Sequence, residues 1–585
     1  MLEVLPGDPT RVLVPRGGGS INLRDAIIRD WGLDRPLLDR WAIFVGNILT
    51  GNWGPSITYR PGVPALDVIL PRVVLTTTLL VAAGAVSFGL AGLLAWGANH
   101  RKGGSMDRVV GGLALAAYPV PVFALSLALL FVLALQLEWF PIGGDRSIVP
   151  PSDFLGQIAD RIYHGFLPVI ALAAASFGFV SLSLREGLGG SRTSRAGYRD
   201  EDAGSSRSPD GNISVSTSLV GAVALFAGWM VAADAFVELL FNLDGVGSLV
   251  WRAIFAFDFF VLSAIFLLTA FIVAAWVTVA DAVHGGLGRL DATRVRYRSA
   301  ATAAKPDWLP ALIARLRSPV GLAGLVLLCL LLGMTVLAPV LVGTALPRDT
   351  PLQPPSDRHL LGTDASGLDN AALLVYGGAE SLVAAAWSFN VAFALGFVVA
   401  IAAGYVRGKA ASISAFANDF ILMIPWIPFA ILPAVILGGV GSAESSTLGV
   451  ALLAWAIPTR SLRLRLETVS RPAAEEDREK PGQRKGEGLL DFVEASLPQV
   501  LSAALFAASI GILMNAGLAF LGFAYATIPS WGSQIRSSYV SLALVRGQWW
   551  AFLAPALMIW LSALSFGLLS HGLGHDSPSF GARNA

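Results

Sequence analysis

Eleven apolar stretches are the feature that most constrains what this chain can fold into. A helix that crosses a bilayer needs about 20 predominantly apolar residues, and most of these stretches reach that length. Five lie in the first half of the chain, at about 70–98, 109–137, 163–184, 217–241 and 259–284. Six lie in the second half, at about 319–343, 381–404, 412–438, 446–458, 498–522 and 549–570. The sequence therefore predicts an all-α polytopic membrane protein with about 11 transmembrane helices.

The composition supports this class and excludes others. Of the 585 residues, 55% are hydrophobic and only 14% are charged, whereas an ordinary soluble domain has about 25% charged residues. A net charge of +1 gives no concentrated basic surface for nucleic acid. The single cysteine, Cys329, lies inside an apolar run, which excludes a disulfide framework and a cysteine-based zinc site. We expect no metal and no cofactor.

Basic residues gather in alternate loops, which sets the expected orientation. Lys and Arg are concentrated in the loops at 99–108, 185–210, 286–318, 405–409 and 459–490. By the positive-inside rule these loops face the cytoplasm. Residues 1–67 are then an extracytoplasmic N-terminal segment, although they contain no apolar run that could carry them across. We therefore expect a first helix to be missing upstream, through a misplaced start site or genuine loss.

The two halves of the chain share one layout. Each has an extracytoplasmic segment, three apolar stretches, a long polar cytoplasmic loop and two further stretches. Tandem units that run in the same direction are one way in which transporters are built. The predicted units are a first half at 68–285, a basic cytoplasmic linker at 286–318 and a second half at 319–585.

Short segments in both halves carry a family resemblance. In the first half they are LPGDP (Leu5–Pro9), WGLDRPL (Trp31–Leu37), GNWGPS (Gly51–Ser56), YPVPVF (Tyr118–Phe123) and ELLFNLDGVG (Glu238–Gly247). In the second half they are HLLGTDASG (His359–Gly367), AGLAFLG (Ala516–Gly522) and PSWG (Pro529–Gly532). In this order they resemble the permease subunits of dipeptide/oligopeptide/nickel-type ABC transporters, which are binding-protein-dependent inner-membrane components. The first half resembles the subunit that precedes its partner in such systems, and the second half resembles the partner.

This resemblance implies two tandem permease halves of the MetI-like type, fused in one chain in the cell membrane of a prokaryote. It implies a pore that moves peptides, or a similar small solute, inward. It also implies two kinds of partner, namely ABC ATPase subunits on the cytoplasmic face and an extracytoplasmic solute-binding protein. In the family LPGDP follows the first span, which agrees with a missing first helix.

The chain itself has no nucleotide-binding motif. A phosphate-binding loop needs the pattern G-x-x-x-x-G-K-[ST]. Among the five lysines only Lys409 follows a glycine, but alanines occupy the other two diagnostic positions, Ala403 and Ala410. We therefore expect a translocation pore rather than an enzyme, with ATP hydrolysis on separate subunits.

The expected ATPase-docking loop precedes the Leu-Pro pair at 497–498. In the family a short cytoplasmic helix carries EAA…G upstream of such a pair, which places Glu479 at the Glu position and Gly486 one residue beyond the Gly position. One of the two alanines is replaced by a proline, which breaks a helix interior. Glu494, in a plausibly amphipathic stretch, is a further candidate. The corresponding loop of the first half, 186–212, is almost free of apolar residues and is either a solvated linker or a divergent docking loop.

Four residues are candidates for lining a pore. Pro425 and Pro428 should kink their span and match a proline near the pore helix of relatives. Asp419 and Asp234 are charged residues within apolar stretches, which are usually functional. The alternative for both aspartates is an interfacial position near the end of a span.

Two other motifs have competing interpretations. In PSWG, proline blocks helix continuation, tryptophan anchors at the bilayer interface and glycine permits a turn. The GTDASG segment predicts a capped turn before a short surface helix. Both segments are either packing devices or contacts for the binding protein. For the whole chain, the alternatives to an importer are a membrane receptor or scaffold without ATPase coupling and an ion-driven transporter, which would need buried acidic residues in mid-membrane.

Overall fold

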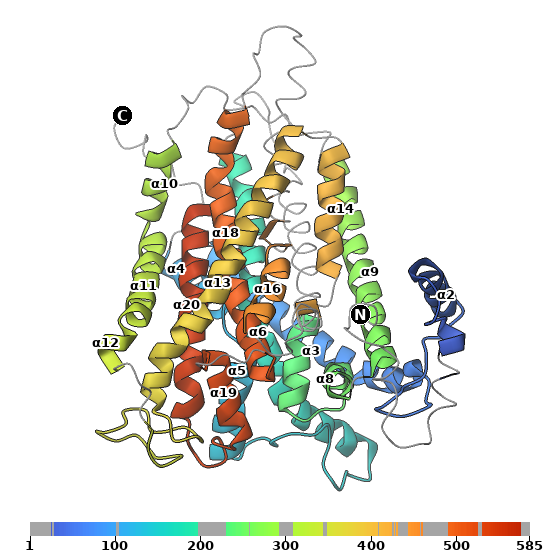
Figure 1. Ribbon diagram of the computed structural model, residues 1–585. Coiled ribbons are helices and arrows are strands. Elements are labelled where there is room, and N and C mark those ends of the chain that lie inside the picture. Colours follow the sequence, from blue (N-terminus) through green and yellow to red (C-terminus); the bar gives the residue numbers. More distant parts are fainter. Residues whose placement is uncertain are drawn as a thin grey trace.

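The computed structural model is a bundle of long helices (Figure 1). It describes residues 28–100, 104–196, 230–256, 258–291, 308–342, 348–406, 409–423, 443–456, 489–523 and 529–574, with a few isolated positions between these ranges. This part of the chain contains no β-strand. The predicted all-α fold is therefore confirmed.

Six helices are long and apolar enough to cross a membrane. They are α3 (Ala65–His100), α6 (Phe154–Ala196), α11 (Pro319–Val336), α13 (Asn370–Ala400), α18 (Leu489–Leu521) and α20 (Trp550–Gly574). Each coincides with one of the predicted stretches. The total of eleven spans stays a prediction, because much of the predicted stretches at 217–241 and 412–438 lies outside the described residues.

The predicted span at 109–137 is broken rather than straight. It consists of α4 (Ser105–Ala117), α5 (Val122–Leu129) and the π-helix η1 (Leu130–Gln136), with a bend of 99° between α4 and α5. Pro119 and Pro121 lie in the break. Because a proline ring clashes with the preceding helical turn and has no N–H to donate, two prolines this close end α4.

The remaining helices are shorter or less apolar. Those of the first half are α2 (Leu37–Leu49), α8 (Val246–Phe255) and α9 (Phe259–Asp291). Those of the second half are α10 (Trp308–Leu316), α12 (Ala338–Val342), the π-helix η2 (Ile401–Val406), α14 (Lys409–Met423), α16 (Ala443–Ala454) and α19 (Trp531–Val540).

Small residues allow the central helices to pack closely. In the first half α3 packs along α6, and in the second half α18 lies between α13 and α20. A Cβ atom at Gly511 of α18 would lie only 2.0 Å from the Ser388 hydroxyl of α13. Packing of this kind replaces the hydrophobic effect as the force between helices in lipid. The two halves also contact each other directly, since α20 touches α4 and α5 and α14 touches α9.

Several connecting segments lie at opposite ends of the bundle, and the predicted orientation stays a prediction. The segments that contain α8 and α19, together with the loop at 348–369, lie at the lower end in Figure 1, while α10 lies near the opposite end. The predicted domain boundary at 67/68 falls in the first turn of α3. The predicted linker at 286–318 includes the last residues of α9 and all of α10.

Candidate functional site

The proline-containing break between α4 and α5 is the place where the first half is fastened to the second. The Tyr118 ring stacks on Phe506 of α18 with 5.3 Å between ring centroids. The Tyr118 hydroxyl also lies 3.4 Å from the Ser509 hydroxyl. From α20, the Trp560 indole N–H donates to the Ala116 carbonyl at 2.8 Å. Because the helix ends here, the Ala116 carbonyl has no intrahelical N–H partner and is free to accept a hydrogen bond from the second half.

An aromatic cluster continues this contact between the halves. Phe123, Phe236, Trp426 and Phe520 form the cluster, two from each half, and we call it the aromatic bridge. Phe123 stacks on Phe520 with a centroid distance of 5.1 Å and lies 5.7 Å from Phe236. Phe236 lies 6.4 Å from both Trp426 and Phe520. Aromatic pairs at these distances are worth roughly 0.5–1.5 kcal/mol each beyond their buried area.

The bridge extends toward the end of the bundle predicted to be extracytoplasmic. Trp251 of α8 stacks on Phe523 with 6.2 Å between centroids, and Phe255 stacks on the same ring at 5.7 Å. Trp251 is itself fixed, because its indole N–H donates to the Ala235 carbonyl at 3.0 Å. The short helix α8 is thereby held against the end of α18.

Beside the aromatic bridge lies a small apolar cavity between the two halves. Its volume is about 30 Å³, which is an order of magnitude below that of a ligand pocket. All the side chains around it are apolar or aromatic: Val120, Pro121, Val122, Phe123, Ala175, Ala232, Ala233, Phe236, Trp426, Leu513 and Met514. The structure therefore has a small apolar contact where the halves meet.

The structure places Asp234 away from this cavity. Ala232, Ala233 and Phe236 line the cavity, and at 3.6 residues per turn Asp234 lies on the opposite side of the same helix. It is buried, with 1% of its surface exposed, and its carboxylate oxygens have no hydrogen-bond partner of normal geometry. Its electrostatic neighbour is Glu238, one turn further along the helix.

Of the other three predicted pore residues, the structure describes only the backbone position of Asp419. Pro425 and Pro428 lie outside the described residues, but Trp426 between them lines the cavity. Asp419 falls within α14. The pore role of these three residues therefore stays a prediction.

Glu238 is a buried carboxylate whose role the sequence analysis missed. Its Oε2 accepts from the Ser248 backbone N–H at 2.7 Å, and its Oε1 accepts from the Thr76 hydroxyl at 2.5 Å. The same Thr76 hydroxyl accepts from the Val246 N–H at 2.9 Å. The N-cap residue of α8 is Gly245, which has no side chain to satisfy these N–H groups. Glu238 and Thr76 therefore supply the cap that α8 lacks.

The GNWGPS segment is held by a second buried carboxylate, Asp258. Its Oδ2 accepts from the Ser56 hydroxyl at 2.6 Å and from the backbone N–H groups of Ile57 and Tyr59, both at 3.0 Å. Asp258 is fully buried just before α9. A carboxylate that accepts several hydrogen bonds can stay inside a protein, so the segment is fixed to the bundle by a contact remote in sequence.

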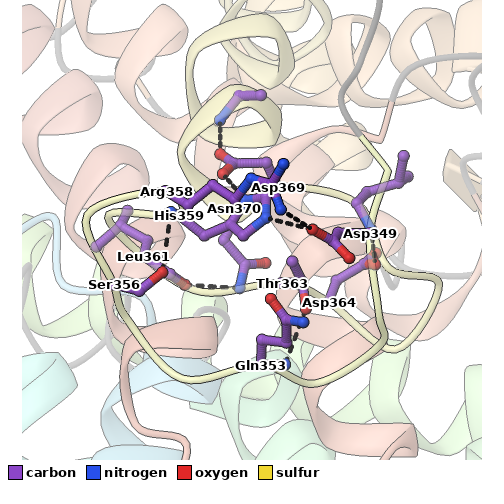
Figure 2. A network of polar contacts seen from close by, with 12 residues as sticks. Asp349, Gln353, Ser356, Arg358, His359, Leu361, Thr363, Asp364, Asp369 and Asn370 are labelled. Carbon is purple, nitrogen blue, oxygen red and sulfur yellow. Dashed lines mark hydrogen bonds and ion pairs between the residues drawn. The ribbon is translucent and has the colours of Figure 1, made fainter.

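The HLLGTDASG segment forms a third polar network, shown in Figure 2. Nδ1 of His359 lies 2.6 Å from Oδ2 of Asp369, and Nε2 lies 3.4 Å from Oδ2 of Asp349. Arg358 lies 3.4 Å from the same Asp349 oxygen. Asp369 is also the N-cap of α13, because its Oδ1 accepts from the Ala372 N–H at 2.8 Å. The network therefore joins a loop predicted to be extracytoplasmic to the start of a spanning helix.

The predicted turn in GTDASG is present, but it precedes a different kind of helix. Oδ1 of Asp364 accepts from the N–H groups of Ser366 and Leu368, both at 2.8 Å. Gly367 has φ of +77°, a conformation that glycine adopts without strain. The expected short surface helix is wrong, since the chain enters the long helix α13 directly after this turn.

The expected bilayer anchor in PSWG is also wrong. Trp531 is fully buried, its indole N–H donates to the Leu374 carbonyl at 2.7 Å, and its backbone N–H donates to the Ser381 hydroxyl at 3.1 Å. A Cβ atom at Gly532 would lie 2.3 Å from the Ala516 carbonyl oxygen. The motif therefore locks α19 between α13 and α18 and is a packing device.

The stability of the HLLGTDASG segment is expected to depend on pH. Asp369 raises the pKa of His359 above its usual value of 6.5. A raised pKa in the folded state stabilises the protein below about pH 6.5, and this contribution is lost as the pH rises through the folded-state pKa. The difference in Tm between the wild type and His359→Gln in detergent should therefore be larger at about pH 5.5 than at about pH 9. An equal difference at both values would show that the His359 charge does not stabilise the segment.

Of the predicted docking residues, the structure describes only Glu494. It lies near the start of α18, and its side chain is exposed. Glu479 and Gly486 lie outside the described residues. The docking site therefore stays a prediction, but Glu494 is accessible to a partner at the end of the bundle predicted to be cytoplasmic.

Comparison with known proteins gives a consistent set of relatives. The chain is 28% identical over 282 residues to a probable peptide ABC transporter permease protein of Sinorhizobium fredii, and this match covers 46% of the chain and 84% of the relative. It is 26% identical over 306 residues to a di/tripeptide transport system permease protein of Pseudomonas aeruginosa, covering 49% and 90%. It is 30% identical over 281 residues to an oligopeptide transport system permease protein of Mycobacterium tuberculosis, covering 45% and 83%. No family model matches the chain.

Proposed function

We propose that this chain, which belongs to the family of peptide ABC transporter permeases, forms by itself the membrane pore of a peptide importer in the bacterial inner membrane. The observation that carries the proposal is the contact between the halves. The YPVPVF break and the aromatic bridge join segments far apart in sequence around one small apolar cavity. A pore between two permease halves needs a contact of this kind, which can open and close.

The proposed arrangement is a fusion of two permease units. Each relative matches nearly half of the chain while contributing most of its own length. The direct contacts of α20 with α4 and α5 support a pairing of the halves within one molecule. We assign the first unit to 68–285 and the second to 319–585, joined through a cytoplasmic linker at 286–318 and preceded by an extracytoplasmic segment at 1–67.

In this proposal the chain performs no covalent chemistry. ABC ATPase subunits would bind the cytoplasmic face and drive the change of conformation, and an extracytoplasmic solute-binding protein would deliver the peptide. The cavity offers no charged group to hold a peptide terminus. Selection among peptides therefore falls to the binding protein, and the pore contributes a surface that tolerates many side chains.

Replacing Glu494 by alanine is expected to weaken ATPase association without affecting membrane insertion. The exposed carboxylate at the start of α18 is available for a hydrogen bond or ion pair with the partner. Rim contacts of this kind usually change affinity by about 1 kcal/mol, or roughly fivefold. The measurement is the amount of ATPase recovered with the tagged protein, with Asp357→Ala, an exposed acid in the loop at 348–369, as the matched control. Equal recovery with both variants would contradict the placement of the docking site.

A mild-detergent pull-down from the native membrane, followed by mass spectrometry, tests the proposed function. Recovery of ATPase subunits together with a solute-binding protein is the expected result, and ATP-dependent peptide uptake by the reconstituted complex should follow. Recovery of the intact chain without any ATPase would overturn the proposal. That result would favour a membrane receptor or scaffold derived from a permease.

A further inference from the structure

The short helix α2 has an apolar stripe that faces away from the protein. The stripe consists of Leu38, Trp41, Ala42, Val45 and Leu49, which recur on one side of a helix with 3.6 residues per turn. Leu38 is 79% exposed, Trp41 is 65% exposed and Leu49 is 81% exposed. A surface helix of a soluble protein normally packs such an apolar stripe against the core. In α2 the apolar stripe points outward instead.

The opposite side of α2 is the side that holds the helix to the bundle. The Phe44 ring lies 5.8 Å from Trp31, which lies 4.6 Å from Phe260 at the start of α9. Asn47, on the same side, donates its side-chain N–H to the Asp30 carbonyl at 3.2 Å. Both the apolar and the polar contacts of α2 with the protein are therefore made from this side, and the helix has no need of the outer stripe to stay in place.

The position of α2 brings the stripe level with the spanning helices. Figure 1 shows α2 at the edge of the bundle beside α9, at a height above α8 rather than beyond the helix ends. The neighbouring helices also present apolar side chains outward, among them Leu70 and Val74 of α3 and Phe271 of α9. The stripe of α2 and these side chains are therefore apolar surfaces that face outward from the bundle.

We propose that α2 lies in the outer leaflet of the bilayer as an interfacial helix, with its stripe of Leu38, Trp41, Ala42, Val45 and Leu49 in contact with lipid. Leucine and tryptophan on one face are typical of helices that lie at the boundary between headgroups and acyl chains. Tryptophan in particular prefers this depth, where its ring is in the apolar layer and its N–H reaches water or headgroups. Asp39 lies at the margin of the stripe in the first turn, where its carboxylate can reach the headgroup layer.

The bilayer fits this surface better than a protein partner does. The five stripe residues have no side-chain hydrogen-bonding group other than the indole N–H of Trp41, and the apolar stripe runs the length of the helix. A lipid surface needs no more than this, whereas a specific protein interface usually adds polar groups around an apolar centre. The inferred helix thus anchors the extracytoplasmic segment of the first half beside the start of α9.

Spin-label accessibility measured in phosphatidylcholine vesicles tests this proposal. The background is the full-length chain with Cys329→Ala, which removes its single cysteine. A nitroxide is then attached at Leu38→Cys, Val45→Cys or Leu49→Cys on the stripe, and at Gly46→Cys near its polar margin. Power saturation compares collisions with oxygen, which concentrates in lipid, and with a nickel chelate, which stays in water. The three stripe positions should show a severalfold higher ratio of oxygen to nickel accessibility than Gly46→Cys.

Two results would overturn the proposal. High nickel accessibility along the stripe would place α2 in water, where an extracytoplasmic partner could bind it. Low accessibility to both reagents would mean that protein, such as a second copy of the chain, covers the stripe. Leu38, Gly46 and Leu49 are exposed and Val45 is half-buried, so unchanged thermal stability of the labelled proteins serves as the folding control.

Discussion

Replacing Glu238 by alanine is expected to destabilise the first half by removing the cap of α8. The substitution removes the acceptor for the Ser248 N–H and for the Thr76 hydroxyl, both in buried surroundings. A buried donor left without a partner costs roughly 1–3 kcal/mol. The start of α8 should loosen, and the Tm of the purified protein in detergent should fall by several degrees.

Glu238→Gln is the matched control for this change. Its amide oxygen can still accept from the Ser248 N–H, and its NH₂ group can donate to the Thr76 oxygen. The variant should therefore lose clearly less stability than Glu238→Ala. Equal losses in the two variants would mean that the charge of Glu238, rather than its hydrogen bonds, holds α8 in place.

Replacing Phe236 by alanine is expected to make the closed pore leak. The Phe236 ring contacts the rings of the other three members of the aromatic bridge, one from the first half and two from the second. It also lines the cavity. Its removal enlarges a cavity of about 30 Å³ at the point where the halves close on each other. A buried Phe→Ala change also costs about 3–5 kcal/mol of stability. Proteoliposomes that contain the variant should dissipate a pH gradient faster than those with the wild type.

Phe552→Ala separates the leak from the loss of stability. Phe552 is also buried, with 1% of its surface exposed against 3% for Phe236, and its ring packs 6.0 Å from Phe131 of the first half. It is absent from the cavity lining. This variant should lose a similar amount of stability and yet hold the gradient. If both variants leak alike, the leak reflects general loosening and the aromatic bridge is not the closing element.

The spans and the order of the elements could be predicted from the sequence because they depend on local composition. A run of about 20 apolar residues identifies a helix in lipid without knowledge of its neighbours. All six long spanning helices coincide with such runs. The bend between α4 and α5 was not predicted, although its cause, Pro119 and Pro121, is visible in the sequence. Two prolines so close together inside an apolar stretch are a signal of a broken span.

The side chains at the contact between the halves could not be predicted, because they depend on packing between distant segments. Phe123 and Phe520 look like any other apolar residues in their helices, and only the fold brings their rings together. Asp234 was chosen for its charge, but the direction in which a helical residue points depends on how the helix is rotated in the bundle. The structure turns Ala233 and Phe236 toward the cavity, and Asp234 therefore away from it.

The buried carboxylates illustrate the same limit. Glu238 and Asp258 are both fully buried, yet neither was singled out from the sequence as a buried carboxylate. Their partners, Thr76 and Ser56, are remote in sequence. A carboxylate in an apolar stretch followed closely by a glycine-flanked short helix is the pattern that could have indicated the cap on α8.

Site-specific photocrosslinking to a transported peptide tests the central claim most directly. A photoreactive benzoylphenylalanine replaces Phe236 in one variant and Phe552 in another, so that each position keeps an aromatic side chain. Both are illuminated in the complete importer, with its ATPase and binding protein, in the presence of a radiolabelled peptide. If the pore runs along the aromatic bridge, the Phe236 variant becomes labelled only while ATP is being hydrolysed, and the Phe552 variant, at another contact between the halves, does not. Active peptide uptake without label at Phe236, or with equal label at both positions, would contradict a pore at the aromatic bridge.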